Sequence, residues 1–324
     1  MIGGRIKMGA QYCIGVDIGG TSVKLGLFTV TGALMDKWEI PTRKDEEGKW
    51  IIPDIAASIK KKMAEKGMQD TDLAGIGMGV PGPIEPDGHV AVCVNLGWKD
   101  RYPAKELSSE LGGKIRAVAG NDANVAALGE MWQGGGKGHT SLVAVTLGTG
   151  VGGGVILNSR IVTGTHGLAG EIGHMHIREE EKEFCNCGGQ GCLEQVASAT
   201  GIVREAKRNL ANTEIPSKMR EFGDALTAKD VCDCAKEGDA LALGTLETCC
   251  RYLGWALALV TQIIDPEIYV IGGGVSKAGQ ILIDLITKYF NQFTPLLKKK
   301  PEIALATLGN DAGIYGAARQ VLGD

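Results

Sequence analysis

The chain has 324 residues, enough for two domains with well-buried cores. Its net charge of −4 argues against a general nucleic-acid partner. No apolar run reaches the roughly 18 residues that a membrane-spanning helix needs, and the first ten residues lack the apolar centre of a signal peptide. We therefore expect a cytoplasmic protein whose nine cysteines stay reduced and are buried or bound to metal.

The first part of the chain predicts a β-meander followed by alternating helices and strands. Three strands with short connections come first, which is typical of antiparallel neighbours. The elements expected here are strands at 11–18, 22–30, 33–41, 73–80 and 115–118, and helices from Asp54 to about Lys66, after Pro103, and from the N-D-A-N sequence to about Gln133.

The second part repeats this order of elements. A second meander is expected at 141–157, followed by mostly helical sequence with a long apolar helix at 239–264. A strand at 267–271 precedes another helix, and a last helix at 312–322 is expected to pack back on the first domain. The repetition predicts an α/β fold class with a duplicated ribonuclease-H-like unit.

Such a duplication predicts two domains around a central cleft, where a ligand would be expected. We expect a small α/β domain at 1–119, completed by the C-terminal helix at about 312–324. The remainder, 120–311, is expected to form a large α/β domain that carries the cysteine motif described below.

Two glycine-rich hairpins look like copies of one another, from Val16 to Phe28 and from Val145 to Leu157. Glycines allow positive φ and leave no Cβ between the backbone and a ligand, so both turns can bring N–H groups close to phosphate oxygens. In a gapless alignment Asp17 corresponds to Thr146, so only the first copy carries a charge. Two hairpins without a ligand are the alternative. We favour a nucleotide cleft in which Asp17 addresses a metal ion.

A cysteine cluster predicts a zinc site. Cys185, Cys187 and Cys192 lie in C-N-C-G-G-Q-G-C, and His174 lies eleven residues before the first of them. Three thiolates and one imidazole complete a tetrahedral site with no open position, which is typical of structural zinc. His176 could replace His174, and three unrelated thiols are the other alternative. The cysteines in helical sequence are better explained by packing: Cys232, Cys234, Cys249 and Cys250.

Two glutamates accompany the predicted zinc ligands, and we expect them to bind sugar hydroxyls. Glu171 precedes His174 by three residues, and Glu194 follows Cys192 by two. A carboxylate can accept hydrogen bonds from two adjacent hydroxyls, and His174 could donate to a hydroxyl through the ring nitrogen that does not bind metal. Either glutamate alone would more often be solvated surface. The phosphate turns are expected to lie elsewhere, apart from Glu194.

Asp122 is the candidate general base. It follows a short strand and opens a predicted helix, so the alternative is an N-cap, which either Asn121 or Asp122 could provide. The side chain that does not cap the helix would be available to a ligand. A hydroxyl that attacks a phosphoryl group needs a carboxylate to orient it and accept its proton.

Seven motifs together resemble the ROK family (repressors, open reading frames and kinases), and among its members the bacterial ATP-dependent glucokinases. The resemblance extends from about Tyr12 to the last helix. It implies the actin-like ATPase fold and phosphorylation of the glucose 6-hydroxyl, which feeds glycolysis. The motifs are D-I-G-G-T-S-V-K, G-V-P-G-P, V-N-L-G-W, G-N-D-A-N-V-A-A-L-G-E, L-G-T-G-V-G-G-G, G-L-A-G-E-I-G-H and C-N-C-G-G-Q-G-C-L-E.

The resemblance also implies roles for individual residues. Asp122 would be the base, and sugar contacts would come from Gly79, Asn95, Asn121, Asp122, Glu171, His174 and Glu194. ATP with Mg²⁺ would bind at Asp17, Gly19, Gly20, Thr21 and Lys24 in the first turn, at Gly148, Thr149 and Gly150 in the second, and at Gly272, Gly273 and Gly274 beside the adenosine. The implied zinc ligands are His174, Cys185, Cys187 and Cys192. The charged segment 178–184 matches no motif, so its shape stays open.

The family also contains rival functions. Its repressors carry a DNA-binding helix-turn-helix ahead of the first turn, whereas only about sixteen residues precede Asp17 here. A non-catalytic sugar-sensing member would not need Asp17, Asp122 and two phosphate turns together. Kinases for another hexose or an N-acylhexosamine share the glutamate pair, and polyphosphate is an alternative donor to ATP. We expect a glucokinase that forms a homodimer or a higher homo-oligomer.

Overall fold

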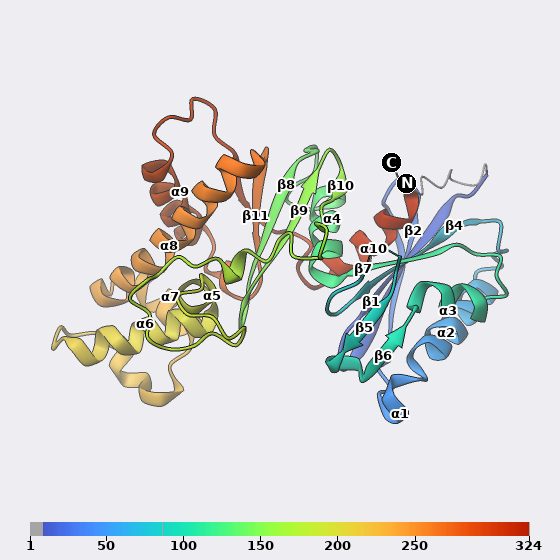
Figure 1. Ribbon diagram of the computed structural model, residues 1–324, viewed down its shortest axis with the longest axis horizontal. Helices are drawn as coiled ribbons and strands as arrows, with labels where there is room; N and C mark the ends of the chain where they lie inside the picture. The colour runs from blue at the N-terminus through green and yellow to red at the C-terminus, as the bar shows by residue number, and fades with distance from the viewer. Residues whose placement is uncertain (1–8, 86, 324) are drawn as a thin grey trace. The chain divides into compact units, whose positions relative to one another are not determined.

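The structure is a computed structural model that describes residues 9–85 and 87–323. The chain divides into two compact units (Figure 1). The prediction about a signal peptide concerns the first ten residues, and residues 1–8 of these lie outside the described residues. Unit 1 consists of Met1–Thr140, Gly154–Ala169 and Leu308–Asp324, and unit 2 consists of Ser141–Gly153 and Gly170–Thr307.

A five-stranded sheet in the order β3-β2-β1-β4-β7 lies at the centre of unit 1. The first three strands form the predicted antiparallel meander, and β4 and β7 run parallel to β1. All eight residues of β4 are buried, as expected of a central strand covered on both faces. The strands are β1 (Tyr12–Ile18), β2 (Ser22–Thr29), β3 (Leu34–Pro41), β4 (Leu73–Val80) and β7 (Ala117–Asn121).

Helices cover both faces of this sheet. One face packs on α2 (Ile51–Glu65) and α3 (Pro103–Glu110) through a buried aliphatic cluster that includes Ile14, Leu25 and Ile55. The remaining elements of unit 1 outside β9 are α1 (Asp45–Gly48), α4 (Asp122–Gln133), α10 (Ala312–Leu322), the hairpin of β5 (Val90–Cys93) and β6 (Trp98–Arg101), and β10 (Arg160–Ile161).

The C-terminal helix α10 packs against α4, β1 and β4, as predicted (Figure 1). Its backbone comes unusually close to the sheet and to α4. A Cβ atom on Gly77 would lie 1.7 Å from the carbonyl oxygen of Ala317, and one on Gly316 would lie 1.6 Å from that of Val125. Only glycine permits such contacts, so these glycines fix how closely α10 is seated.

The second sheet repeats the first. Its order is β10-β9-β8-β11-β12, and β8, β11 and β12 run parallel. Asp17 on β1 is paired with Gly79 on β4, and Thr146 on β8 is paired with Gly272 on β11, so the two hairpins align as the sequence predicts. The strands are β8 (Leu142–Leu147), β9 (Val151–Leu157), which leaves unit 2 after Gly153, β11 (Ile268–Gly272) and β12 (Glu302–Leu305).

The rest of unit 2 is mostly helical. The long apolar helix α8 packs against α6, α7 and α9, and none of the described helices is long and apolar enough to cross a membrane. The helices are α5 (Glu194–Ala197), α6 (Ala199–Asn212), α7 (Ala228–Lys236), α8 (Ala240–Ile264) and α9 (Gln280–Phe293). Short 3₁₀ helices occur in unit 2 at Ile172–His174, Lys218–Ala225 and Val275–Ala278, and in unit 1 at Val94–Leu96 and Gly309–Asp311.

The elements predicted from periodicity agree with the structure to within a few residues. The hairpin of β5 and β6 and the edge strands β10 and β12 were not predicted, because each has only two to four residues. The compact units differ from the expected domains, since α4 and the segment Gly154–Ala169 belong to unit 1. The predicted domain boundary at residue 119 stays a prediction.

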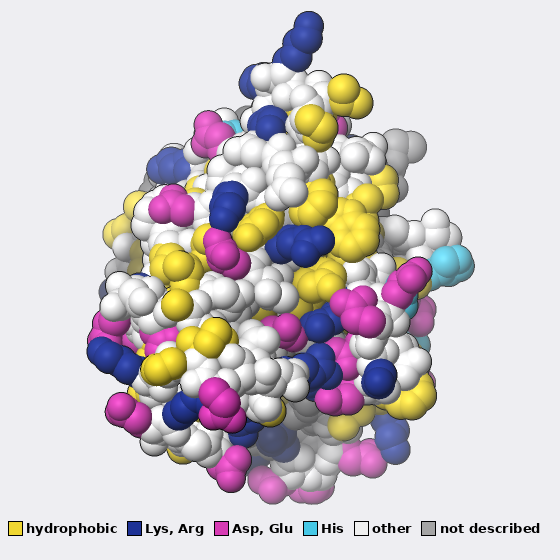
Figure 2. All heavy atoms as spheres, turned by 90° about the vertical axis from the view of Figure 1, so that its left-hand side faces the viewer, with side chains coloured by type: hydrophobic (Ala, Val, Ile, Leu, Met, Phe, Trp, Pro, Cys, Tyr) yellow, Lys and Arg dark blue, Asp and Glu magenta, His cyan; other side chains and the backbone are white. Residues whose placement is uncertain are grey.

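On the face shown in Figure 2, acidic, basic and hydrophobic side chains are interspersed.

Candidate functional site

Two aspartates come together at one edge of the first sheet. Strands β1, β4 and β7 are parallel, so their carboxyl ends lie side by side. Asp17 is the last residue but one of β1, Gly79 is its partner on β4, and Asp122 follows β7 as the first residue of α4. A Cβ atom on Gly79 would lie 3.6 Å from Asp17 Oδ1 and 3.7 Å from Asp122 Cα. Gly79 is therefore adjacent to both carboxylate residues.

The environment of Asp17 disfavours its charge. Burial first, and then the charge of Asp122, raise the pKa of this carboxyl to about 6, and Lys24 opposes the shift. Lys24 is its cross-strand partner, and the ammonium of Lys24 donates to the carbonyl of Asn310 at 3.2 Å. Two acids in one partly buried place are a typical arrangement for binding a cation.

The start of α10 also touches Asp17, which the sequence did not indicate. A Cβ atom on Gly313 would lie 2.6 Å from Asp17 Oδ2, so no larger residue fits without moving that carboxylate. The N-D-A-G sequence before this glycine has no recognisable signal for such a role. Only the packing of α10 on β1 reveals the contact.

The structure resolves which residue caps α4. Asn121 is the N-cap, and its Oδ1 accepts a hydrogen bond from the N–H of Asn124 at 3.1 Å. Its amide group donates to the carbonyl of Gly82 at 3.1 Å and to Asp122 Oδ1 at 3.2 Å. Asp122 Oδ1 also accepts from the N–H of Ala123 at 2.8 Å. One carboxylate oxygen of Asp122 is thus held by two donors, which orients the side chain.

The first glycine turn is held from both sides. The N–H of Gly19 donates to the carbonyl of Ser22 at 2.9 Å, and the hydroxyl of Thr42 donates to the carbonyl of Gly19 at 2.7 Å. A Cβ atom on Gly20 would lie 4.0 Å from the carbonyl oxygen of Asn95. Thr21 and Asn95 are exposed, so both can reach a ligand.

The second glycine turn is held by the start of α6. Within the turn, the N–H of Gly148 donates to the carbonyl of Gly150 at 2.9 Å. The N–H of Ala199 donates to the carbonyl of Gly148 at 2.8 Å, and the hydroxyl of Thr200 donates to the carbonyl of Thr149 at 2.8 Å. The carbonyls of Gly148 and Thr149 therefore face α6.

The four predicted metal ligands converge in unit 2. The ligand atoms of His174, Cys185, Cys187 and Cys192 all lie within 4.8 Å of one another. Cys187 Sγ is 3.6 Å from Cys192 Sγ, and Cys185 Sγ is 3.8 Å from His174 Nδ1. Tetrahedral zinc with bonds of about 2.3 Å would separate two sulfurs by about 3.8 Å, so the donor set fits this ion. His176 is not in the group, because its Nδ1 contacts the carbonyl of Gln190 at 2.7 Å.

Both predicted glutamates lie beside this cysteine–histidine group. Glu171 Oε2 is 4.0 Å from Nε2 of His174, the ring nitrogen on the side away from the thiols. Glu194 Oε1 accepts from the thiol of Cys185 at 3.5 Å, while Oε2 accepts from the N–H of Val151 at 3.0 Å. The expectation that the phosphate turns lie apart from Glu194 is wrong, because Val151 directly follows the second turn.

A pocket of about 400 Å³ lies beside the third glycine motif. Gly273 has φ of +84° and packs against the backbone of Leu147, whereas Gly274 has no atoms within 4 Å of a Cβ position and opens to the pocket. The walls were missed by sequence reasoning because they are ordinary helix residues of α7 and its neighbours. They include Ala199, Thr227, Lys229, Cys232, Lys236 and Lys277.

Known proteins match this chain over nearly its whole length. The family model described as the ROK family matches residues 13–323. A glucokinase of Halalkalibacterium halodurans is 44% identical over 95% of this chain and 94% of that protein, and one of Thermotoga maritima is 36% identical over 94% and 95%. The crystal structure of a ROK family glucokinase from Streptomyces griseus in complex with glucose and AMPPNP has a TM-score of 0.72 and 31% identity, covering 95% of this chain and 98% of that one.

Proposed function

The chain belongs to the ROK family, and we propose that it is an ATP-dependent glucokinase that transfers the γ-phosphoryl group of ATP to the 6-hydroxyl of D-glucose. The observation that carries this proposal is the 44% identity to a glucokinase over almost the entire chain. The geometry of the aspartates, glycine turns and cysteine–histidine group supports it independently. The product, glucose 6-phosphate, would enter glycolysis.

Asp122 is the general base in this proposal. The sugar hydroxyl would donate to the Asp122 carboxylate and transfer its proton there as the oxygen attacks the γ-phosphorus. Hydrogen bonds from Asn121 and Ala123 to Oδ1 support this role, because they hold the carboxylate in one orientation. Gly79 and Asn95 would contact the sugar from neighbouring positions in unit 1, with Asn121 beside them.

Asp17 serves the phosphate side of the reaction. Mg²⁺ bound with ATP would neutralise charge on the phosphates, and the raised pKa of Asp17 indicates a carboxylate that a cation would stabilise. Lys24 and the N–H groups at Gly20 and Thr21 would face the phosphates, as would those at Thr149 and Gly150. Gly19 and Gly148 would shape the two turns, because their N–H groups donate to carbonyls within them. The pocket beside Gly274 has the size and apolar walls to take the adenosine, with Gly272 and Gly273 behind it.

The cysteine–histidine group would hold a structural zinc ion, because its four ligands leave no open position. The ion would bring Glu171 and Glu194 into one place, where their carboxylates could accept hydrogen bonds from adjacent sugar hydroxyls. His174 would bind zinc through Nδ1 and donate to the sugar through Nε2, in keeping with the side of the ring that faces Glu171.

A coupled assay tests the substrate. ATP-dependent phosphorylation should be fastest with glucose in a panel that includes mannose, fructose, N-acetylglucosamine and N-acetylmannosamine, with polyphosphate as the rival donor. A higher kcat/KM for another sugar would show that glucose is not the preferred substrate, and the assignment as a sugar kinase would still hold. Sugar binding without any phosphoryl transfer would instead favour a sugar-sensing protein. We also propose that the protein is cytoplasmic and forms a homodimer. Light scattering of purified protein would test the oligomeric state.

A further inference from the structure

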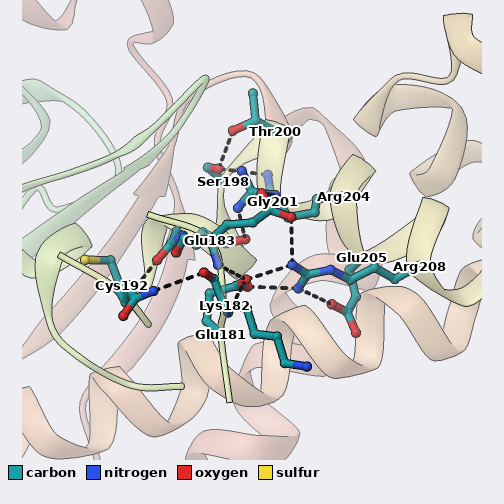
Figure 3. Close-up of polar contacts among 12 residues, drawn as sticks. Glu181, Lys182, Glu183, Cys192, Ser198, Thr200, Gly201, Arg204, Glu205 and Arg208 are labelled. Carbon is teal, nitrogen blue, oxygen red and sulfur yellow. Dashed lines mark hydrogen bonds and ion pairs between the residues drawn. The ribbon is translucent and has the colours of Figure 1, made fainter. Parts of the chain in front are cut away.

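The charged segment 178–184, which matches no family motif, is anchored to helix α6. Figure 3 shows Glu181 facing Arg208 of this helix. The two guanidinium nitrogens of Arg208 donate to the two carboxylate oxygens of Glu181 at 2.8 and 2.7 Å. The Glu181 side chain is fully buried, and the Arg208 hydrogen bonds lower its pKa to about 2 despite that burial. The pair is therefore ionised at any working pH.

Further contacts join the same segment to the same helix. Arg178 donates to Glu205 at 2.8 Å, and both side chains are largely buried. Arg204 pairs with Glu183 at 3.1 Å. Arg208 also donates to Glu183 at 3.1 Å. A bidentate pair to a buried carboxylate with three flanking pairs is a rigid attachment, unlike the isolated exposed ion pairs that contribute little. The segment between the metal ligands therefore keeps a fixed position relative to α6.

The buried amide of Gln195 extends this attachment to a metal ligand. Its Oε1 accepts from the N–H of Cys192 at 3.1 Å, and its Nε2 donates to the carbonyl of Glu183 at 2.9 Å. Glu194, the residue before it, contacts Cys185. A shift of Glu183 relative to α6 would consequently be transmitted to the cysteine–histidine group and to Glu194.

The opposite end of α6 holds the second glycine turn. Ser198 caps the helix by accepting from Gly201 at 3.0 Å and lies 2.9 Å from the hydroxyl of Thr200 (Figure 3). Ala199 and Thr200 then donate to the carbonyls of the turn, as described above. A single helix of 14 residues thus contacts the second glycine turn at its first residues and the segment 178–184 along its body.

We propose that Glu181 and Arg208 form a positioning pair that couples sugar binding to nucleotide binding through α6. The proposal rests on the proposed function, because it assigns Glu194 to the sugar and the second turn to ATP. Nucleotide binding positions the turn and hence the start of α6. The pair transmits that position to the segment 178–184, and Gln195 passes it on to Cys192 and to Glu194 at the start of α5. Neither residue of the pair is among those assigned to the sugar or to ATP in the proposed function.

The test measures glucose affinity by calorimetry with and without AMPPNP in the zinc-bound protein. In the wild type, AMPPNP should tighten glucose binding within the roughly 5- to 150-fold range typical of coupled sites. Glu181→Gln removes the charge but keeps the volume, and it should lower this ratio by at least about threefold while zinc content stays at one per chain. The direct contact of Glu194 with Val151 remains and would carry the residual coupling. Arg208→Lys, which keeps the charge and loses the bidentate geometry, should give an intermediate ratio.

A matched control is Glu247→Gln, which breaks an exposed pair with Lys288 on α8 and α9 and should leave the ratio unchanged. An unchanged ratio in both Glu181→Gln and Arg208→Lys, or no coupling in the wild type, overturns the proposal. Loss of zinc from both variants also overturns it, since the pair would then only hold the metal loop together. Failure of the wild type to bind glucose at all would instead contradict the proposed function, and the inference with it.

Discussion

Glu194 Oε2 accepts a hydrogen bond of 3.0 Å from the backbone N–H of Val151. Its other oxygen contacts a predicted zinc ligand, so one carboxylate joins the cysteine–histidine group to the strand that follows the second glycine turn. A Cβ on Gly150 would lie 2.2 Å from Glu194 Oε2, which means that any larger residue at 150 would displace this carboxylate. The proposed sugar and phosphate sites are therefore neighbours within unit 2.

Glu194→Gln should weaken the binding of both sugar and ATP. Hydrogen bonds to charged groups contribute roughly 1.5–3 kcal/mol, so sugar affinity should fall by about ten- to a hundred-fold. The weakened contact to Val151 should also raise KM for ATP, while zinc content stays near that of the wild type because no ligand is changed. Calorimetry with glucose and steady-state kinetics with ATP provide the two measurements. A normal KM for both substrates would show that Glu194 serves the fold alone.

Asp122→Asn should lower turnover without weakening glucose binding. The asparagine oxygen can still accept from the N–H of Ala123, and its amide can still bond the sugar hydroxyl, but no proton acceptor remains. Loss of a positioned general base typically reduces the rate about 10²- to 10⁴-fold. Turnover above a third of the wild-type rate would exclude Asp122 as the base. The neighbouring Asn124→Ala variant, which leaves both acids intact, is the control for disturbance of α4.

Asp17→Asn should stabilise the metal-free protein at neutral pH. The pKa of Asp17 rises from 3.8 to about 6 on folding, so between these values the unfolded chain has released a proton that the folded protein retains. Stability contributed by this group is therefore present below about pH 4 and is lost as the pH rises through about 6. The variant avoids this loss, which amounts to about 3 kcal/mol at most.

Denaturant unfolding at several pH values measures this effect. The stability gain of Asp17→Asn over the wild type should grow between about pH 4 and 7 and then level off, while use of Mg·ATP should fall sharply. Thr146→Ala is the matched control, because Thr146 occupies the equivalent strand position, is exposed and carries no charge. A gain that is independent of pH would mean that the Asp17 carboxyl keeps its ordinary pKa in the folded protein.

Cys187→Ser should release the metal. Elemental analysis should find about one zinc per wild-type chain and almost none in the variant. Because a structural ion contributes its binding free energy to folding, the variant should melt at a lower temperature and lose sugar affinity together. Cys234→Ser is a suitable control, since this buried thiol lies in α7 outside the metal group. Active wild-type protein without zinc would remove the basis for the paired-glutamate sugar site.

Local patterns in the sequence were sufficient for the regular elements and for the clustering of the cysteine–histidine group. Alternation and helical periodicity predicted the strands and α8 because those signals are repeated over many residues. The C-N-C-G-G-Q-G-C spacing predicted the metal ligands, because glycines in so short a loop leave few other arrangements of the thiols. The duplicated hairpins predicted that Asp17 and Thr146 occupy equivalent places, and the strand pairing confirms it.

Tertiary structure decided the contacts between distant segments. Whether Asn121 or Asp122 caps α4 depends on a difference of one residue in where the helix begins, which periodicity does not resolve. The contact of Gly313 with Asp17 and the pairing of Glu181 with Arg208 join residues that are far apart in the chain. No local pattern encodes such pairings, because the sequence around an aspartate or glutamate does not show whether its carboxylate is solvated or paired with a distant arginine.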